Sequence, residues 1–364
     1  MAAKSLTVLF TIGKFLTITP SYNAKVSLFQ KVYIFILVTL TVVISTLSIS
    51  NRKYYSSELY VKVTVTFITD LLLLVFSCYA PLNAVLWKSE KWHKLMNNLN
   101  LMVSMSKNSD QIVRNVRISI AKLGTDLVIV IGEFCFWCHV FGFTIYAKQF
   151  NVHYLEFYLI NSYNVFLSLI LSLILIQYQH LNATLEEHFG SGRISSHKIP
   201  IVLNKIENNL FFLKDLVNLF NNIFGWPIAI IISYTTIFIL NNFDYIFETT
   251  VQIKEITGKR ILADVVSVLL VFLGTATVIA ICDLILKEAE EMLATSYTLR
   301  RNTKSLSPKD KEHLKHFTKM ILQNFPKFSA ARFFNIDRST ILNMLGTVTT
   351  FFIILIQFRS CVPS

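Results

Sequence analysis

Hydrophobic residues along this chain gather in seven long runs that are separated by polar and charged segments. About 20 predominantly apolar residues cross a bilayer as an α-helix, and a longer run tilts or extends beyond it. The runs lie at residues 32–48, 60–86, 118–146, 155–178, 216–240, 261–286 and 341–358. The pattern therefore predicts an all-α, polytopic membrane protein with seven transmembrane helices.

Basic residues are distributed unevenly among the segments that join these runs. Residues 1–31, 87–122, 179–215 and 287–340 hold 26 of the 34 Lys and Arg residues. Cytoplasmic loops of membrane proteins carry such an excess of Lys and Arg. We therefore expect the N-terminus inside the cell and the C-terminus outside, which is the reverse of a G-protein-coupled receptor.

Composition agrees with a membrane location. The chain of 364 residues is 53% hydrophobic and 15% charged, and its mean hydropathy is +0.53. Soluble domains contain about 25% charged residues. The net charge of +12 lies in the loops between apolar runs. It therefore indicates orientation and contact with lipid headgroups, and nucleic acid is not an expected partner.

The last apolar run carries a polar stripe. Asn343, Thr347, Thr350, Ile354 and Gln357 recur every three or four residues, so they share one face of a helix. A polar stripe on a membrane helix faces protein or water. One interpretation is close helix packing around Gly346, Thr347 and Thr350. The other is the wall of an aqueous pore that narrows at the apolar Ile354.

The C-terminal residues resemble a known family. Thr350-Phe351, five apolar residues and Gln357-Phe358 are similar to the C-terminal signature of insect gustatory receptors, in which Tyr is usual at the position of Phe351. The preceding segment, residues 328–339 (FSAARFFNIDRS), also resembles the family. The resemblance covers about thirty residues, and elsewhere the chain agrees in length and in the order of its spans.

The resemblance implies a gustatory receptor in the plasma membrane that acts as a ligand-gated, non-selective cation channel for a small-molecule tastant. It also implies a homo- or hetero-tetramer with other gustatory receptors, in which one copy of the last helix from each subunit surrounds a central pore. Asn343, Thr347, Thr350, Ile354 and Gln357 would then face the pore. Ile354 or Phe358 would form the closed gate.

The remaining segments suggest a division of the chain. We expect a cytoplasmic N-terminal segment at 1–31, which lies on the membrane surface, and six ligand-binding spans at 32–286. A cytoplasmic anchor at 287–340, the pore helix at 341–358 and an outer tail at 359–364 follow. Apolar residues at helical spacing in 181–189, 202–220, 287–299 and 313–325 need partners, so these stretches are expected to form one packed bundle.

Polar and aromatic residues within the spans are candidates for a ligand pocket. Asp70 and Glu133 are costly in a membrane, so each requires a buried partner, for which Lys62 is a candidate in the case of Asp70, or a solvated cavity. Mixed rings and polar groups suit a small organic ligand. The candidates are Asp70, Glu133, Trp137, His139, Tyr158, Asn161, Tyr163, Asn164, Tyr234 and Asp264.

Enzymes are disfavoured because the sequence contains no GxSxG, P-loop or HExxH motif. Cys135 and Cys138 form a CxxC pair inside an apolar run, where buried, inert thiols are expected rather than a metal site. Cys361 lies in the expected outer tail, and we expect no metal or cofactor. A metabotropic seven-span receptor and a transporter remain as alternative functions.

Overall fold

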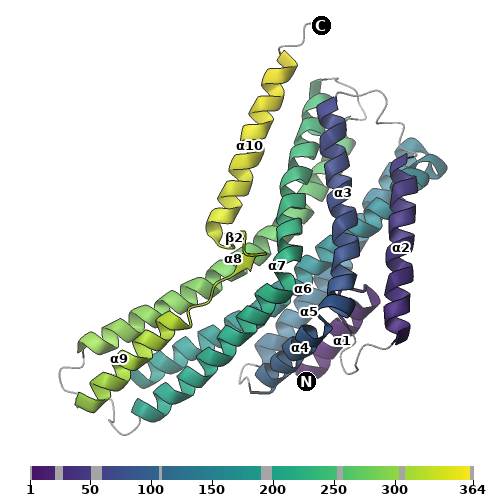
Figure 1. The fold of residues 1–364 in the computed structure, drawn as a ribbon. Coiled ribbons are helices and arrows are strands. Elements are labelled where there is room, and N and C mark those ends of the chain that lie inside the picture. The colour runs from purple at the N-terminus through teal and green to yellow at the C-terminus, as the bar shows by residue number, and fades with distance from the viewer. Residues whose placement is uncertain are drawn as a thin grey trace.

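The computed structural model describes residues 2–20, 28–50, 60–105, 109–189, 199–251, 257–302 and 308–360. Nearly all of these residues are helical (Figure 1). The N-terminal half contains α1 (Ala2–Phe15), α2 (Leu28–Ser50), α3 (Tyr60–Leu82), the π-helical turn η2 (Asn83–Trp87), α4 (Ser89–Met105) and α5 (Ser109–Phe141). The C-terminal half contains α6 (Phe143–Phe189), α7 (Ile199–Val251), α8 (Thr257–Asn302), α9 (Pro308–Gln323), β1 (Ser329–Ala330), β2 (Phe334–Asn335) and α10 (Arg338–Ser360).

Each of the seven predicted spans falls on a helix, namely α2, α3, α5, α6, α7, α8 and α10. By length and composition, five helices among the described residues can cross a membrane: Leu28–Ser50, Val63–Trp87, Val152–Phe189, Pro200–Phe243 and Ile261–Arg301. A shorter apolar helix covers Arg338–Ile354. The all-helical fold is therefore confirmed, whereas the orientation of the spans in the membrane stays a prediction.

One turn differs from the sequence-based expectation. We expected the third span to continue to Tyr146 and an irregular loop to cover residues 147–153, but α5 ends at Phe141 and α6 is already helical from Phe143. Gly142 alone separates the two helices, at φ +85°. Glycine adopts this backbone conformation without steric cost, which permits the abrupt turn. The aromatic and polar residues after Gly142 are thereby fixed on a helix.

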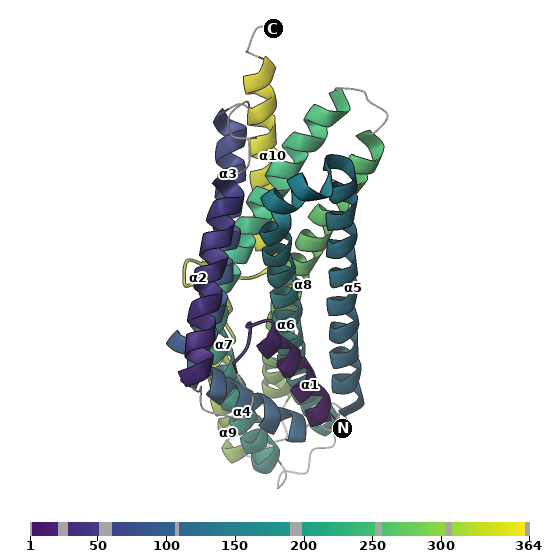
Figure 2. The same ribbon diagram turned by 90° about the vertical axis from the view of Figure 1, so that its right-hand side faces the viewer.

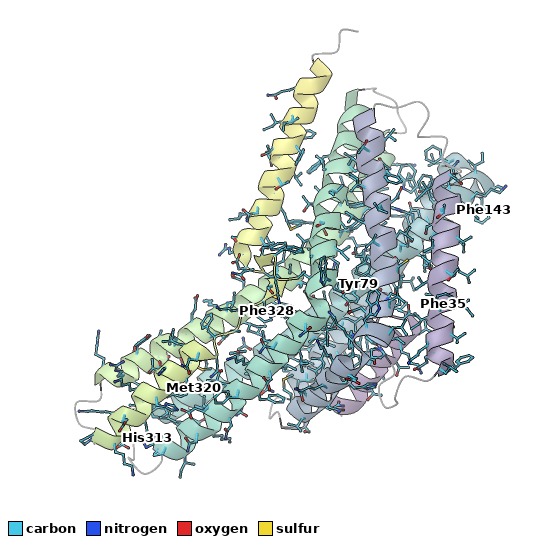
Figure 3. All side chains as sticks on the ribbon, viewed as in Figure 1. Phe35, Tyr79, Phe143, His313, Met320 and Phe328 are labelled. Carbon is cyan, nitrogen blue, oxygen red and sulfur yellow. The ribbon has the colours of Figure 1, made fainter. Side chains whose placement is uncertain are left out.

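Four long helices continue past the membrane-spanning region into a second bundle. The lower ends of α6, α7 and α8 lie beside α9 at the lower left of Figure 1, and α9 contacts both α7 and α8. Leu314, Phe317 and Ile321 bury one face of α9. Figure 3 places Met320 and His313 in this bundle, at the far end of the molecule from Phe143. The amphipathic stretches thus find the partners that their apolar stripes require.

Helix α1 differs from the expected surface segment. Its apolar face is covered by protein, because Leu6, Leu9 and Phe10 are buried and the helix contacts α4 and α5 (Figure 2). The Cβ of an alanine at Gly13 would lie 2.7 Å from the Phe166 ring of α6. Residues 2–15 are therefore an integral part of the bundle.

A short β-hairpin connects the α9 bundle to α10. Ser329 pairs with Asn335 and Ala330 with Phe334, in antiparallel register. The hairpin is fastened to α7, since the Asn221 side chain donates a hydrogen bond to the Lys327 carbonyl (2.6 Å) and accepts one from the Ser329 amide (3.2 Å). Phe328 packs edge-on against Phe220. Figure 3 shows Phe328 just below the base of α10.

Gly225 of α7 permits this attachment, and its replacement is a test. A Cβ at this position would lie 2.9 Å from the Ala331 amide nitrogen and 3.3 Å from the Ser329 carbonyl oxygen, and backbone atoms yield little. We expect Gly225→Ala to lower the free energy of unfolding by about 1–3 kcal/mol, the usual cost of overpacking, measured by thermal melting of the purified protein. Gly124→Ala is the matched control, because no atom lies within 4 Å of its Cβ. Equal melting of both variants would contradict this account.

Candidate ligand pocket and pore helix

A cavity of about 500 Å³ opens among five helices, at the end of the bundle where α5 turns into α6. Ligand pockets of proteins commonly enclose 300–1,000 Å³. The residues that line it come from α3 (Thr66), α5 (Glu133, Trp137, Phe141), α6 (Ile145, Tyr146, Gln149, Phe150, His153, Tyr154, Phe157), α7 (Phe238, Asn241, Asn242) and α8 (Asp264, Ser267).

Stacked rings form one wall of this cavity. Trp137 stacks on Phe141 with centroids 5.6 Å apart and planes 11° apart, and Phe141 stacks on Tyr146 at 5.9 Å and 10°. Tyr146 in turn stacks on Phe150 at 4.7 Å. The Tyr146 and Tyr154 hydroxyls share a hydrogen bond of 2.7 Å. The one-residue turn at Gly142 brings the rings of α5 and α6 into this layer.

Polar groups lie on the helices that face the rings. The Thr66 hydroxyl donates a hydrogen bond to Oδ1 of Asn241 (3.1 Å), which joins α3 to α7. The Ser267 hydroxyl of α8 donates to Oε1 of Glu133 on α5. Glu133 and Asp264 therefore supply two carboxyl groups to the same cavity.

Two further carboxyl groups lie behind the cavity around His153. Nδ1 of His153 is 3.4 Å from Oδ1 of Asp70. A small recess of about 10 Å³ joins His153 and Asp70 to Glu156, which accepts a hydrogen bond from the Ser45 hydroxyl (2.9 Å). The buried partner of Asp70 is therefore His153 of α6, while the side chain of Lys62, the candidate from the sequence, lies outside the described part of the chain.

The structure separates the predicted pocket residues into two groups. Glu133, Trp137 and Asp264 line the cavity, and Asp70 contacts it through His153. The other candidates lie elsewhere, namely His139, Tyr158, Asn161, Tyr163, Asn164 and Tyr234, since none of them is part of the lining. His139 is exposed, and the Tyr158 hydroxyl is 3.4 Å from the Leu123 carbonyl oxygen.

Most of these other residues serve packing in the core. The Asn161 amide donates to the Phe157 carbonyl of its own helix (2.8 Å). The Asn164 amide lies 3.5 Å from the Thr275 hydroxyl, which shares a hydrogen bond of 2.8 Å with Thr235 and so ties α6, α7 and α8 together. Tyr163 and Tyr234 are fully buried against aromatic neighbours, with Tyr163 against Phe76 and Tyr234 against Phe238.

Sequence reasoning missed the part of the pocket that comes from the first turns of α6. Tyr146, Gln149, Phe150 and His153 were assigned to the end of a span or to a loop, so their shared helical face was not evident. Their spacing of three, one and three residues is nevertheless the signal of a common face on one helix.

The CxxC pair has two different environments. Cys138 is buried as expected, but Cys135 is exposed, because positions three residues apart on this helix point to different neighbours. Both thiols are free, as are Cys78 and Cys282. No group of three or more His, Cys, Asp or Glu side chains in the described residues is arranged to hold a metal ion. Cys361 lies outside those residues.

The polar stripe of α10 points away from its own chain. Met344 and Val348 are buried on the side of α10 that contacts α7 and α8, whereas Asn343, Thr347, Thr350, Ile354 and Gln357 are exposed. Ile354 is 38% exposed. The region within 4 Å of a Cβ at Gly346 is empty, so close packing of this stripe inside one chain is excluded. The side chain of Phe358, the other gate candidate, lies outside the described part of the chain.

Helix α10 is connected to the cavity through α7. Asn241 and Asn242 line the cavity, and the next residue, Phe243, contacts Phe352 of α10 with ring centroids 6.1 Å apart. Phe352 lies two residues before Ile354. The same stretch of α7 therefore contacts both the cavity and the part of α10 that carries the apolar position of the polar stripe.

The arrangement of these helices matches that of known chemoreceptors. The family model of the 7tm chemosensory receptors matches residues 6–360, which is almost the whole chain. The chain belongs to the 7tm chemosensory receptor family. This 7tm chemosensory receptor is similar to gustatory receptor 68a of Drosophila melanogaster (32% identity over 126 residues) and to gustatory receptor 28b of the same species (27% over 149 residues).

The similarity to these two gustatory receptors is confined to part of each protein. It covers 33% and 40% of this 7tm chemosensory receptor, respectively, and 31% of each relative. The fold is similar over a much greater length to the insect olfactory receptor OR5 from Machilis hrabei. The structure of OR5 in complex with eugenol aligns with a TM-score of 0.71 over 98% of this chain and 99% of that one, at 15% identity. A second OR5 structure aligns with a TM-score of 0.62 over 91% and 90%.

Proposed function

We propose that this 7tm chemosensory receptor is a gustatory receptor of the plasma membrane, and that a small-molecule tastant opens a non-selective cation channel within it. The observation that carries the proposal is the orientation of α10. Four polar side chains and Ile354 form one exposed face, opposite the face that packs on α7 and α8. A polar stripe that its own chain leaves uncovered in a membrane requires water or another subunit. A pore at the centre of a homo- or hetero-tetramer supplies both.

The gating mechanism follows from the shared contacts of α7. A ligand in the cavity touches Asn241 and Asn242, and Phe243 transmits a displacement of this part of α7 to Phe352. A ring of four Ile354 side chains excludes water from a narrow pore until α10 moves. The ligand opens the pore only to the extent that it binds the open state more tightly than the closed state.

Whole-cell recording from cells that express this chain alone tests the proposal. We expect a ligand-evoked current that carries Na⁺ and K⁺ about equally and that persists without GTP in the pipette. The screen uses sugars, bitter compounds and amines, with surface expression confirmed by an external tag. A response that requires GTP would indicate a metabotropic receptor, and substrate uptake without current would indicate a transporter.

The membrane orientation is tested at Asn182, the site of the sequon Asn182-Ala183-Thr184. The Asn182 amide donates to the Glu288 carbonyl (2.8 Å) and to Oε2 of Glu288 (2.6 Å), in the part of α6 and α8 that we place in the cytoplasm. We therefore expect no glycan at Asn182, measured as an unchanged gel mobility after endoglycosidase treatment. A sequon introduced after residue 360 is the positive control and should be glycosylated. A glycan at Asn182 would invert the topology.

A further inference from the structure

The cavity combines stacked aromatic rings with an excess of carboxyl groups. Glu133 and Asp264 line it, and Asp70 and Glu156 lie directly behind His153. Glu133, Asp70 and Glu156 are each at most 7% exposed. Among the described residues, the lining contains no lysine or arginine, and His153 is its one imidazole. Four carboxyl groups therefore face one side chain that becomes cationic on protonation.

Carboxylates in such an enclosed place need compensation. Removing a charge from water costs several kcal/mol unless an opposite charge or several hydrogen bonds accompany it. His153, at 3.4 Å from Asp70, compensates one of the four, and Ser267 and Ser45 each donate one hydrogen bond to Glu133 and Glu156, respectively. An anionic ligand would add to the repulsion and a neutral one would leave it unchanged. A cationic ligand would relieve it.

The ring layer favours the same class of ligand. The faces of Trp and Tyr carry negative charge in their π-systems, and they attract an ammonium group within about 6 Å of the ring centroid. Trp137, Phe141, Tyr146 and Phe150 are stacked in one series, which is continued by the Tyr146–Tyr154 hydroxyl pair. The rings lie opposite Ser267 and Asp264 of α8 across the cavity.

We propose that this cavity selects organic cations, namely aromatic or alkyl amines and quaternary ammonium compounds, with the charged nitrogen held by Glu133 and Asp264 and the apolar part packed on the Trp137–Tyr146 layer. The inference rests on the proposed function, because it takes the same cavity as the site of the tastant. It adds the chemical class of the tastant, which neither the family nor the relatives determine.

Equilibrium binding to the purified receptor tests the class of ligand independently of any current. Phenyltrimethylammonium carries a permanent charge, and tert-butylbenzene has the same shape without charge. Ligand affinities follow from the rise in melting temperature with ligand concentration. We expect the cation to bind about tenfold more tightly or better, since a desolvated cation–π contact alone contributes roughly 2 kcal/mol.

Two variants locate the charge that recognises the cation. Glu133→Gln and Asp264→Asn keep the size of each side chain, and each should weaken binding of phenyltrimethylammonium by about tenfold while leaving tert-butylbenzene unchanged. Asp126→Asn is the control, because Asp126 is a buried carboxyl on the same helix as Glu133 but outside the lining. It should leave both affinities unchanged.

The outcomes separate this inference from the proposed function. Equal binding of the two compounds, no binding of either by a protein that melts cooperatively, tighter binding of a neutral sugar, or unchanged cation affinity in both Glu133→Gln and Asp264→Asn would overturn the ammonium class. Preferential binding of the cation that depends on Glu133 and Asp264 supports it, even if cells that express the chain show no current. That last result would instead count against the channel.

Discussion

Replacement of Ile354 by alanine is expected to produce a current in the absence of ligand. The side chain is exposed on the polar face of α10, where it is the apolar member of the series. The change removes three carbon atoms from each subunit, at about 0.8 kcal/mol per buried CH₂ group. In a tetramer, a fraction of this total suffices for the ~1.4 kcal/mol that changes an open-to-closed ratio tenfold. We therefore expect the resting current to rise about tenfold or more.

The measurement is whole-cell current before and during ligand application, normalised to surface expression. Leu342→Ala is the matched control, because Leu342 is exposed on α10 but away from the polar stripe. Its resting current should match that of the unmodified receptor. An unchanged resting current and dose response in Ile354→Ala, at normal surface expression, would show that Ile354 is not the gate.

Replacement of Phe243 by alanine is expected to separate ligand binding from opening. Phe243 contacts Phe352 of α10 but does not line the cavity, so its loss should leave the ligand affinity within about twofold. Coupling free energies between sites are typically 1–3 kcal/mol. The loss of this contact should therefore reduce the maximal ligand-evoked current by about fivefold or more. Binding to the purified protein and current in cells are measured with the same ligand.

Phe211→Ala provides the comparison for Phe243→Ala. Phe211 is an exposed ring on the same helix, α7, but it lies in the second bundle, far from α10. It should change neither affinity nor maximal current. If Phe243→Ala weakened binding and current in equal proportion, the ring would belong to the ligand site, and the coupling path through Phe352 would be refuted.

The fold was largely predictable because its main signals are local. Runs of apolar residues long enough to cross a bilayer identify all seven spans, and apolar spacing of three and four residues identifies the bundle around α9. The turn at Gly142 was not predictable in this way. Residues 147–153 mix Lys148, Gln149 and Asn151 with aromatic residues, so their hydropathy resembles that of a loop although they continue a helix.

The pocket was predicted less completely for a geometric reason. Charge in an apolar span identified Asp70, Glu133 and Asp264, because such residues need a polar environment wherever they lie. Tyr163 and Asn164 are chemically equivalent to pocket residues, and only the rotation of α6 directs them into the core instead. The rotation depends on how three long helices cross, and no single segment of the sequence contains it. Asn343, Thr347, Thr350, Ile354 and Gln357 remain predictions as pore residues.

The hairpin at the base of α10 makes this helix a lever. Asn221, Phe220 and the space left by Gly225 hold residues 327–331 against α7, so the lower end of α10 is a pivot. Ile354 lies fourteen residues above Thr340, or roughly 21 Å at 1.5 Å per residue. A tilt of only ~5° about this pivot carries Ile354 sideways by about 2 Å at that height. With four such levers around an axis, the pore would widen by about twice this distance, close to the radius-to-diameter difference of a water molecule.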